Sequence, residues 1–256
     1  MNEETLRHKI RALPALGDPA RFTWDFRRKN LRDKILADDP AFFLDWPVSK
    51  EALYTGWTRI TKDMQQELMA QPRWAEMYDK VIRHPTFGTS LMMNTSGTTI
   101  HQAWHVEQWE SFTGTRVGEL DGIVEFGGGY GAMALLCHNL GFAGDYHIAD
   151  FPEMQCLQDY YLSNMSDMML VSGVDSPDLY IALFSLSEQR LNERTIPDAA
   201  SYLIGYQTGW GEGEESWDNV EYFDWMRCAK PDLEWVDYPN PYFESHRVMI
   251  GYVPES

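Results

Sequence analysis

A glycine-rich run between a short apolar segment and a helical segment is the feature that most constrains the fold of this chain. The run reads Gly127-Gly128-Gly129-Tyr130-Gly131; it follows the apolar segment Gly122–Phe126 and precedes Ala132–Leu140. Glycine turns the backbone tightly and lets another molecule approach it closely. A helix that begins at such a run presents free backbone N–H groups to a ligand. The sequence therefore predicts a strand, a binding loop and a helix.

Short apolar segments and helical segments alternate beyond this loop. Strands are predicted at Gly122–Phe126, Asp145–Ala149, Met168–Ser172, Leu179–Leu183 and Ser201–Tyr206, and helices at Ala132–Leu140, Glu153–Ser163, Leu191–Ala200 and Ser216–Ala229. This alternation predicts an α/β fold with a mostly parallel sheet and helices on both faces. The last two predicted strands, Leu233–Asp237 and Arg247–Tyr252, are joined by nine residues. That connection is too short for a parallel crossover, so we expect an antiparallel C-terminal hairpin.

Residues 1–83 differ from the rest of the chain, because their apolar residues recur at spacings of three and four between prolines. This pattern predicts helices. The segment Thr99–Trp109 also has a helical pattern. The short basic run Arg27-Arg28-Lys29 is interpreted as a solvated helix face.

Charge is distributed unevenly along the 256 residues, which carry a net charge of −18. Residues 1–100 contain 15 Lys and Arg against 13 Asp and Glu, whereas residues 101–256 contain 6 against 26. An acidic body of this kind repels a phosphate backbone, so we expect no binding of nucleic acid. The content of hydrophobic residues, 44%, is that of a globular protein with a substantial core.

Three widely spaced cysteines, Cys137, Cys156 and Cys228, form no metal-binding or paired pattern. They predict buried thiols in a reducing compartment, and hence a cytoplasmic protein. The charged start of the chain predicts no signal peptide. No apolar run is long and continuous enough to predict a membrane span.

Two acidic residues end neighbouring predicted strands. Glu125 lies near the end of Gly122–Phe126, and Asp150 follows Asp145–Ala149. Carboxylates at adjacent strand ends accept hydrogen bonds from ribose hydroxyls or from an amino group, and they tolerate a cationic ligand. The glycine run also fits the GxGxxA pattern of dinucleotide sites, with Asp150 as the ribose acid. A tight turn that binds nothing is a third interpretation.

The segment from Glu125 to Gly131 resembles the S-adenosylmethionine loop of class I methyltransferases. The segments Glu125–Leu136, His147–Met154, Tyr160–Ser163 and Asp178–Glu188 resemble the sugar O-methyltransferase family, and His101–Thr113 is similar to the helix before its loop. The resemblance implies a Rossmann-like methyltransferase domain over residues 119–256. It also implies that residues 1–118 form a helical N-terminal extension that covers the acceptor site.

The resemblance further implies S-adenosylmethionine as the cofactor and assigns residues to it. Glu125 and Asp150 would hold its polar groups, and Phe151 would pack on the adenine. The methionine and ribose portions would be lined by Gly127, Gly128, Gly129 and Gly131. The expected reaction is methyl transfer to a hydroxyl of a saccharide-like small molecule or glycan. A catalytically silent cofactor-binding partner module and an NAD-type oxidoreductase remain the alternatives.

An alcohol is a weak nucleophile, so methyl transfer to it benefits from a general base. His101 and His105 lie four residues apart in a predicted helix and therefore share a face. An imidazole titrates near neutral pH and suits proton abstraction. Glu188 follows the predicted strand Leu179–Leu183 and is expected to orient a histidine. Two structural histidines are the alternative, and no metal site is predicted, because the helix has Gln102 where a zinc motif needs Glu.

Overall fold

The computed structural model describes residues 1–17, 24–53, 55–56, 58–83, 87–88, 95–210 and 217–254. The α-helices are α1 (Glu3–Ala12), α2 (Trp24–Ala37), α3 (Pro47–Ala52), α4 (Arg59–Ala70), α5 (Pro72–Val81), α6 (Gly97–Thr113), α7 (Ala132–Asn139), α8 (Pro152–Met165) and α9 (Asn219–Ala229). Short 3-10 helices are η1 (Pro40–Asp45), η2 (Val117–Glu119), η3 (Leu186–Glu188) and η4 (Leu191–Glu193). The helical character expected of the first 83 residues is confirmed within the described ranges.

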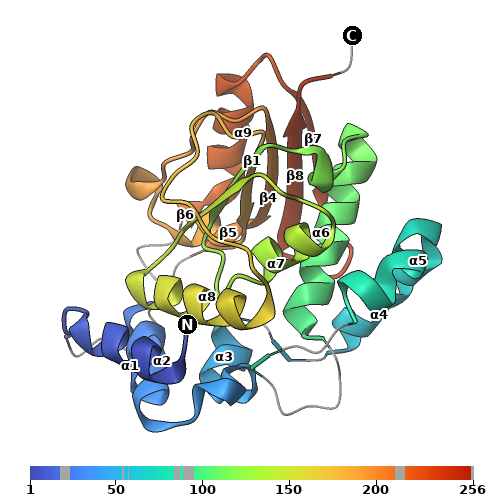
Figure 1. The fold of residues 1–256 in the computed structure, drawn as a ribbon. Coiled ribbons are helices and arrows are strands. Elements are labelled where there is room, and N and C mark those ends of the chain that lie inside the picture. The colour runs from blue at the N-terminus through green and yellow to red at the C-terminus, as the bar shows by residue number, and fades with distance from the viewer. Residues whose placement is uncertain are drawn as a thin grey trace. The chain divides into compact units, whose positions relative to one another are not determined.

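A six-stranded sheet has the order β2-β1-β3-β4-β8-β7 (Figure 1). Its strands are β1 (Gly122–Phe126), β2 (Asp145–Ala149), β3 (Leu179–Leu183), β4 (Ser201–Gln207), β7 (Glu234–Pro239) and β8 (His246–Tyr252). The first four strands pair in parallel, whereas β8 runs antiparallel to both β4 and β7. The expected α/β class, mostly parallel sheet and antiparallel C-terminal hairpin are confirmed. A separate small ribbon pairs β5 (Gly209–Trp210) with β6 (Trp217–Asp218).

Two of the predicted elements are wrong. The segment Met168–Ser172 forms no strand; it keeps one ladder-like bond, from the Val171 N–H to the Tyr146 carbonyl, and Met169 is 84% exposed. The predicted helix Leu191–Ala200 is reduced to η4, because the Arg194 side chain donates to the carbonyls of Ser187 and Gln189 and holds the segment open. The predicted helix from Ser216 begins at Asn219, and Ser216 lies outside the described residues.

The chain divides into two compact units that interleave along the sequence. One consists of residues 1–104, 129–140 and 150–169, and the other of residues 105–128, 141–149 and 170–256. The predicted boundary between residues 118 and 119 stays a prediction. The unit that contains residues 1–104 is the helical unit, and the unit that contains residues 170–256 is the sheet unit.

The sheet unit buries both faces of its sheet. On one face, α9 inserts Phe223 against Tyr206 of β4, with ring centroids 4.3 Å apart. On the other face, the C-terminal half of α6 meets Tyr238 of β7, whose hydroxyl donates to Gln108 Oε1 at 3.3 Å. Since Tyr238 is in register with Val248, it points away from the face that carries Met249 and α9.

The helical unit is built around an aromatic cluster. Phe43 of η1, Tyr130 of the glycine loop and Tyr161 of α8 stack edge to face, with centroids 4.8 to 6.0 Å apart. The Tyr130 hydroxyl lies 2.7 Å from the Ser96 hydroxyl. The glycine loop before α7 is thereby hydrogen-bonded to Ser96, the residue before α6 begins at Gly97.

Three further expectations concern cysteines and membranes. The cysteines are free, as expected, and Cys137 and Cys156 are buried. Cys228 is exposed, which corrects the prediction, because it lies on the side of α9 opposite the buried Phe223 and Met226. Across the described ranges, every helix is too short or too polar to cross a bilayer.

Candidate functional site

The glycine run adopts a backbone that few other residues tolerate. Gly127, Gly129 and Gly131 have φ angles of +72°, +58° and +91°. A side chain at these positions would be strained whatever space surrounds it. The predicted succession of strand, glycine loop and helix is confirmed over β1 and α7.

Internal packing explains part of this glycine requirement. A Cβ at Gly128 would lie 2.7 Å from Glu125 Oε2 and 2.7 Å from Ile148 Cγ2. A Cβ at Gly127 would overlap Ser185, whose hydroxyl donates to the Phe126 carbonyl. Gly127 therefore lies directly against Ser185. A glycine is needed at position 127 even without a ligand.

Glu125 is a buried acid on β1. Its Oε2 accepts a hydrogen bond of 2.9 Å from the Tyr146 hydroxyl on neighbouring β2. Glu125 is therefore held in place one residue before the end of β1, and its role toward a ligand stays a prediction.

Asp150 follows the last residue of β2 and organises the backbone around it. Its Oδ2 accepts the Gly129 N–H at 2.9 Å and Gln158 Nε2 at 3.2 Å, while its Oδ1 accepts the Phe151 N–H at 2.7 Å. Burial raises the pKa of the Asp150 carboxyl to about 7, although the two backbone N–H groups partly offset that effect. Asp150 therefore holds the Gly129 backbone in place and has a pKa near neutral pH. Its Oδ1 accepts one hydrogen bond, from Phe151, and can accept another.

Gln158 of α8 is a site residue that the sequence analysis missed. It is buried, and its Nε2 donates to the Gly129 carbonyl at 2.9 Å as well as to Asp150. An amide between the apolar residues Leu157 and Tyr161 on the buried side of a helix is the signal that would have revealed it. Gln158 therefore links Gly129 of the loop to the Asp150 carboxylate through its side-chain amide.

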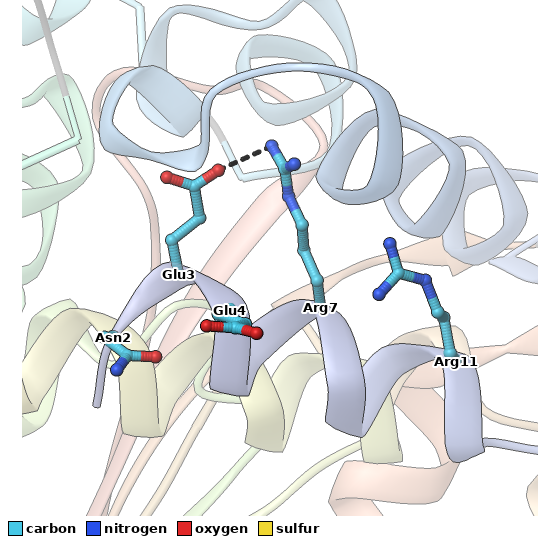
Figure 2. Close-up of a pocket in the computed structure, with 5 residues that line it drawn as sticks. All are labelled: Asn2, Glu3, Glu4, Arg7 and Arg11. Atoms are coloured by element: carbon cyan, nitrogen blue, oxygen red, sulfur yellow. Dashed lines mark ion pairs between the residues drawn. The ribbon is translucent and has the colours of Figure 1, made fainter.

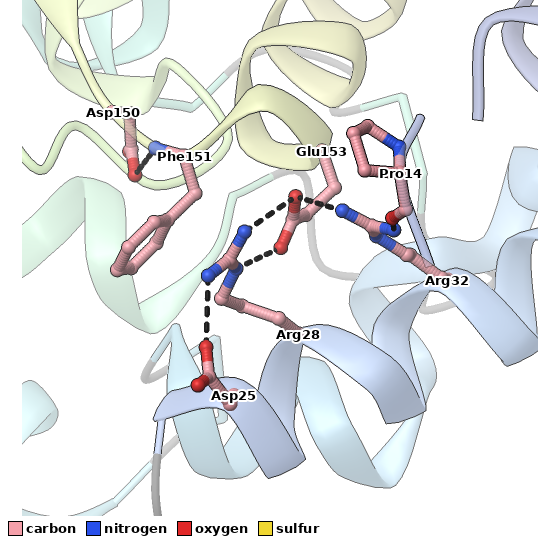
Figure 3. Close-up of polar contacts among 7 residues, drawn as sticks. All are labelled: Pro14, Asp25, Arg28, Arg32, Asp150, Phe151 and Glu153. Carbon is pink, nitrogen blue, oxygen red and sulfur yellow. Dashed lines mark hydrogen bonds and ion pairs between the residues drawn. The ribbon is translucent and has the colours of Figure 1, made fainter. Parts of the chain in front are cut away.

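Phe151 is 36% exposed, and residues of α2 cover part of its ring (Figure 3). The Arg28 guanidinium lies 4.3 Å from the ring centroid, and the Trp24 ring lies 6.0 Å away. The interpretation of Arg27-Arg28-Lys29 as a solvated face is therefore wrong for Arg28. Its side chain also pairs with Glu153, which is fully buried.

A second group of residues gathers at the carboxyl ends of β3 and β4 in the sheet unit. His105 of α6 is fully buried, and its ring meets Phe184 edge to face at 5.9 Å. Phe184, the first residue after β3, has a φ of +70° and packs against His246 at 4.7 Å. Gln207, at the end of β4, donates to Glu188 Oε1 at 3.5 Å and is in register with His246.

This group contains two of the predicted catalytic residues, His105 and Glu188, and one that was missed. Burial lowers the pKa of His246, and its Nδ1 is buried with no hydrogen-bond partner in the described part of the chain. His246 begins a strand late in the sequence, so only the antiparallel pairing of β8 with β4 reveals its place. His101, one turn before His105 on α6, is half-buried and belongs to the helical unit.

Metal and cavity data add no further site. Within the described ranges, no group of three or more His, Cys, Asp and Glu side chains is placed to hold a metal ion. A cavity of about 410 Å³ opens beside α1, lined by Asn2, Glu3, Glu4, Arg7 and Arg11 (Figure 2). Arg7 is already engaged there, with the Ile35 and Asp38 carbonyls and with Glu3. The cavity contains none of the predicted site residues.

Comparison of the whole chain with known proteins gives likenesses of structure only. No protein-family model matches, and no curated protein matches by sequence. Fibrillarin from Aeropyrum pernix with bound S-adenosyl-L-methionine is 15% identical, with a TM-score of 0.41, over 59% of this chain and 74% of that one.

Two methyltransferases of small molecules match over more of this chain. Mitomycin 7-O-methyltransferase is 12% identical, with a TM-score of 0.39, over 98% of this chain and 72% of that one. Human N-acetylserotonin methyltransferase is 12% identical, with a TM-score of 0.36, over 91% and 68%. The ligands of these methyltransferases are properties of those proteins. For the present chain, the residues of its own loop and strands are the evidence for a ligand.

Proposed function

We propose that this protein is an S-adenosylmethionine-dependent methyltransferase. The observation that carries the proposal is the loop between β1 and α7. Three glycines with positive φ follow Glu125 there, and the Gly129 N–H donates to Asp150, the residue after β2. Ligands of open α/β sheets bind outside the carboxyl ends of the strands. The loop, the two acids and their strand positions together fit a nucleoside with hydroxyl and amino groups.

The charges of the site residues support this choice of cofactor. A sulfonium carries a positive charge and an amino acid carries an ammonium group, and Glu125 and Asp150 supply carboxylates to such donors. Ribose hydroxyls donate to the free acceptor position of Asp150 Oδ1. The exposed part of the Phe151 ring offers an apolar face to adenine. In contrast, the acidic C-terminal part of the chain disfavours the two phosphates of NAD.

The acceptor in this proposal is a hydroxyl of a saccharide-like small molecule or glycan. Bound S-adenosylmethionine supplies an electrophilic methyl group on sulfur. His105 would accept the proton of the acceptor hydroxyl, and Glu188 would orient the imidazole. The protein would align the hydroxyl and exclude water, and such positioning lowers a barrier by up to ~7–11 kcal/mol. His101 would contact the acceptor. We place this activity in the cytoplasm, because the three cysteines are free.

Ligand-induced stabilisation tests the cofactor assignment. S-adenosylhomocysteine at 100 times its dissociation constant should stabilise the protein by about 2.7 kcal/mol, whereas NAD should not. Stabilisation by NAD alone would identify an oxidoreductase. Binding of S-adenosylhomocysteine without methyl turnover on a panel of glycans and small alcohols would identify a silent module.

Comparison of His105→Ala with His246→Ala tests the base. We expect His105→Ala to lower turnover by ~10²–10⁴-fold with little change in S-adenosylhomocysteine affinity, because only proton removal is lost. His246→Ala serves as the control, since His246 packs against the same Phe184 ring. A loss that is confined to His246→Ala would transfer the role to His246, whose burial keeps it neutral and able to accept a proton.

A further inference from the structure

A buried ion cluster lies at the N-terminus of α8, immediately after the two residues assigned to the cofactor. Glu153, the second residue of α8, is 0% exposed and accepts hydrogen bonds from two arginines of α2 (Figure 3). Arg32 Nη2 lies 3.0 Å from Glu153 Oε2, and Arg28 donates to the same carboxylate through Nε and Nη2. Arg32 also donates to the Pro14 carbonyl at 2.6 Å.

This cluster is an inefficient way to obtain stability alone. Taking a carboxylate and two guanidinium groups out of water has a desolvation penalty, and well-packed apolar residues of similar volume often stabilise a protein as well or better. Burial opposes ionisation of Glu153, yet the hydrogen bonds from Arg28 and Arg32 outweigh burial and lower the pKa of its carboxyl. The cluster is therefore a fixed group of buried charges. Its desolvation penalty points to a role beyond packing.

Arg28 connects the cluster to the exposed ring of Phe151. One Arg28 nitrogen, Nη1, pairs with Asp25 at 2.8 Å, while the guanidinium carbon lies 4.3 Å from the Phe151 centroid. A guanidinium held by carboxylates on two sides has little freedom to rotate. It therefore fixes the orientation of the Phe151 ring from one side and leaves 36% of the residue exposed.

Glu153, the acid of this cluster, also acts on the neighbouring carboxyl of Asp150. The groups that face Asp150 are the Gly129 and Phe151 N–H groups, the Gln158 amide and the negative charge of Glu153. After burial, the charge of Glu153 is a further influence that raises the pKa of Asp150.

We propose that Arg28 is a positioning residue for the cofactor: from α2, it holds the Phe151 ring so that the ring's exposed part stacks on an adenine. The inference rests on the proposed function and extends it, because α2 then belongs to the nucleoside-binding machinery and is more than a cover of the acceptor site. The ligand class that this arrangement recognises is an adenine nucleoside, bound through its base.

The test is a comparison of Arg28→Gln with Lys29→Gln. Both variants remove one positive charge from α2, but Lys29 pairs only at the surface with Asp33, at 3.4 Å. The affinity for S-adenosylhomocysteine and for adenosine is measured by calorimetry between pH 6 and 9. Arg28→Gln should weaken both ligands by the same factor, about three- to thirty-fold, since a cation–π contact and a ring orientation are lost.

Two further variants separate positioning from folding. Arg28→Lys keeps the charge and loses the planar fork, so it should lie between the wild type and Arg28→Gln, and it replaces Arg28→Gln if that variant does not fold. In a Phe151→Leu background, substitution of Arg28 should have little additional effect on adenosine affinity, because the two residues act through one ring.

Three results would overturn the inference: wild-type affinity in a folded Arg28 variant, equal losses in Arg28→Gln and Lys29→Gln, or full additivity with Phe151→Leu. If the wild-type protein itself fails to bind S-adenosylhomocysteine, the proposed function fails instead. The two failures are therefore distinguishable in the same experiment.

Discussion

Asp150 is the residue whose protonation is best placed to control ligand binding. Burial raises the pKa of its carboxyl to about 7, and both of its oxygens accept hydrogen bonds from backbone N–H groups. Only the ionised form can accept ribose hydroxyls while it also holds Gly129 and Phe151. We therefore expect the protonation state of Asp150 to change the acceptor capacity that it offers to a ligand.

The affinity for S-adenosylhomocysteine should therefore rise with pH through the neutral range. Below about pH 7 the neutral form dominates, and affinity should fall by up to about tenfold for each pH unit. Above about pH 8 the profile should be flat. Asp150→Asn is the control, because it keeps the shape of the side chain and removes the titration. A wild-type profile parallel to that of Asp150→Asn would show that another group controls binding.

Arg28 shows where residue-level reasoning from sequence stops. A basic triplet in a helical segment usually points to solvent, and Lys29 does so. The buried partner of Arg28 is Glu153, which lies 125 residues away in sequence. The local sequence pattern of neither segment predicts this ion pair. Glu125, Asp150 and the glycines were accessible to prediction, because their chemistry lies within a few residues of a strand end.

At the scale of elements, apolar patterning predicted the sheet well. The predicted bounds of β1, β2 and β3 agree with the observed ones, because each is a short segment of five mostly apolar or β-forming residues. The same criterion failed at Met168–Ser172, where the apolar run lies along β2 for one backbone bond only. It also failed at Leu191–Ala200, where only Leu191–Glu193 is helical and Pro197 cannot continue a helix.

Asp178 is the joint between β1 and β3, and its removal should destabilise the sheet unit. Its Oδ2 accepts the backbone N–H groups of Asp121 at 2.7 Å and Gly122 at 3.0 Å. Asp178→Ala leaves both donors without that acceptor, so the free energy of unfolding in urea should fall by about 1–3 kcal/mol. Asp178→Asn keeps one oxygen and should lose less. Equal unfolding free energies in wild type and Asp178→Ala would contradict this role.

At the scale of the whole molecule, the net charge of −18 is concentrated after residue 100. Like charges repel within a compact chain, so the folded protein should be more stable when salt screens them. Raising NaCl from about 0.01 M to 0.15 M shortens the screening length from ~30 Å to ~8 Å. The melting temperature should rise by about 2–4 °C for each kcal/mol gained.

A sucrose series at matched osmolality is the control for this salt prediction, because sucrose does not screen charge. A melting temperature that falls with salt would mean that attractive pairs, such as Lys9 with Asp159 or Lys230 with Asp198, outweigh the repulsion. The carboxylate of each pair is exposed, by 47% at Asp159 and 101% at Asp198, and exposed pairs contribute little on average. The repulsive term is therefore expected to dominate.

The strained residue at the end of β3 has a consequence for evolution. Phe184 holds a φ of +70°, its N–H donates to the Gly205 carbonyl at 2.7 Å, and its ring lies 3.0 Å from where a Cβ on Gly205 would be. A side chain at position 205 would require the Phe184 ring to shift. In descendants of the same ancestral gene, any side chain at 205 should be accompanied by a smaller residue at 184. Such paired changes would leave a covariation signal between two residues that are 21 positions apart in sequence.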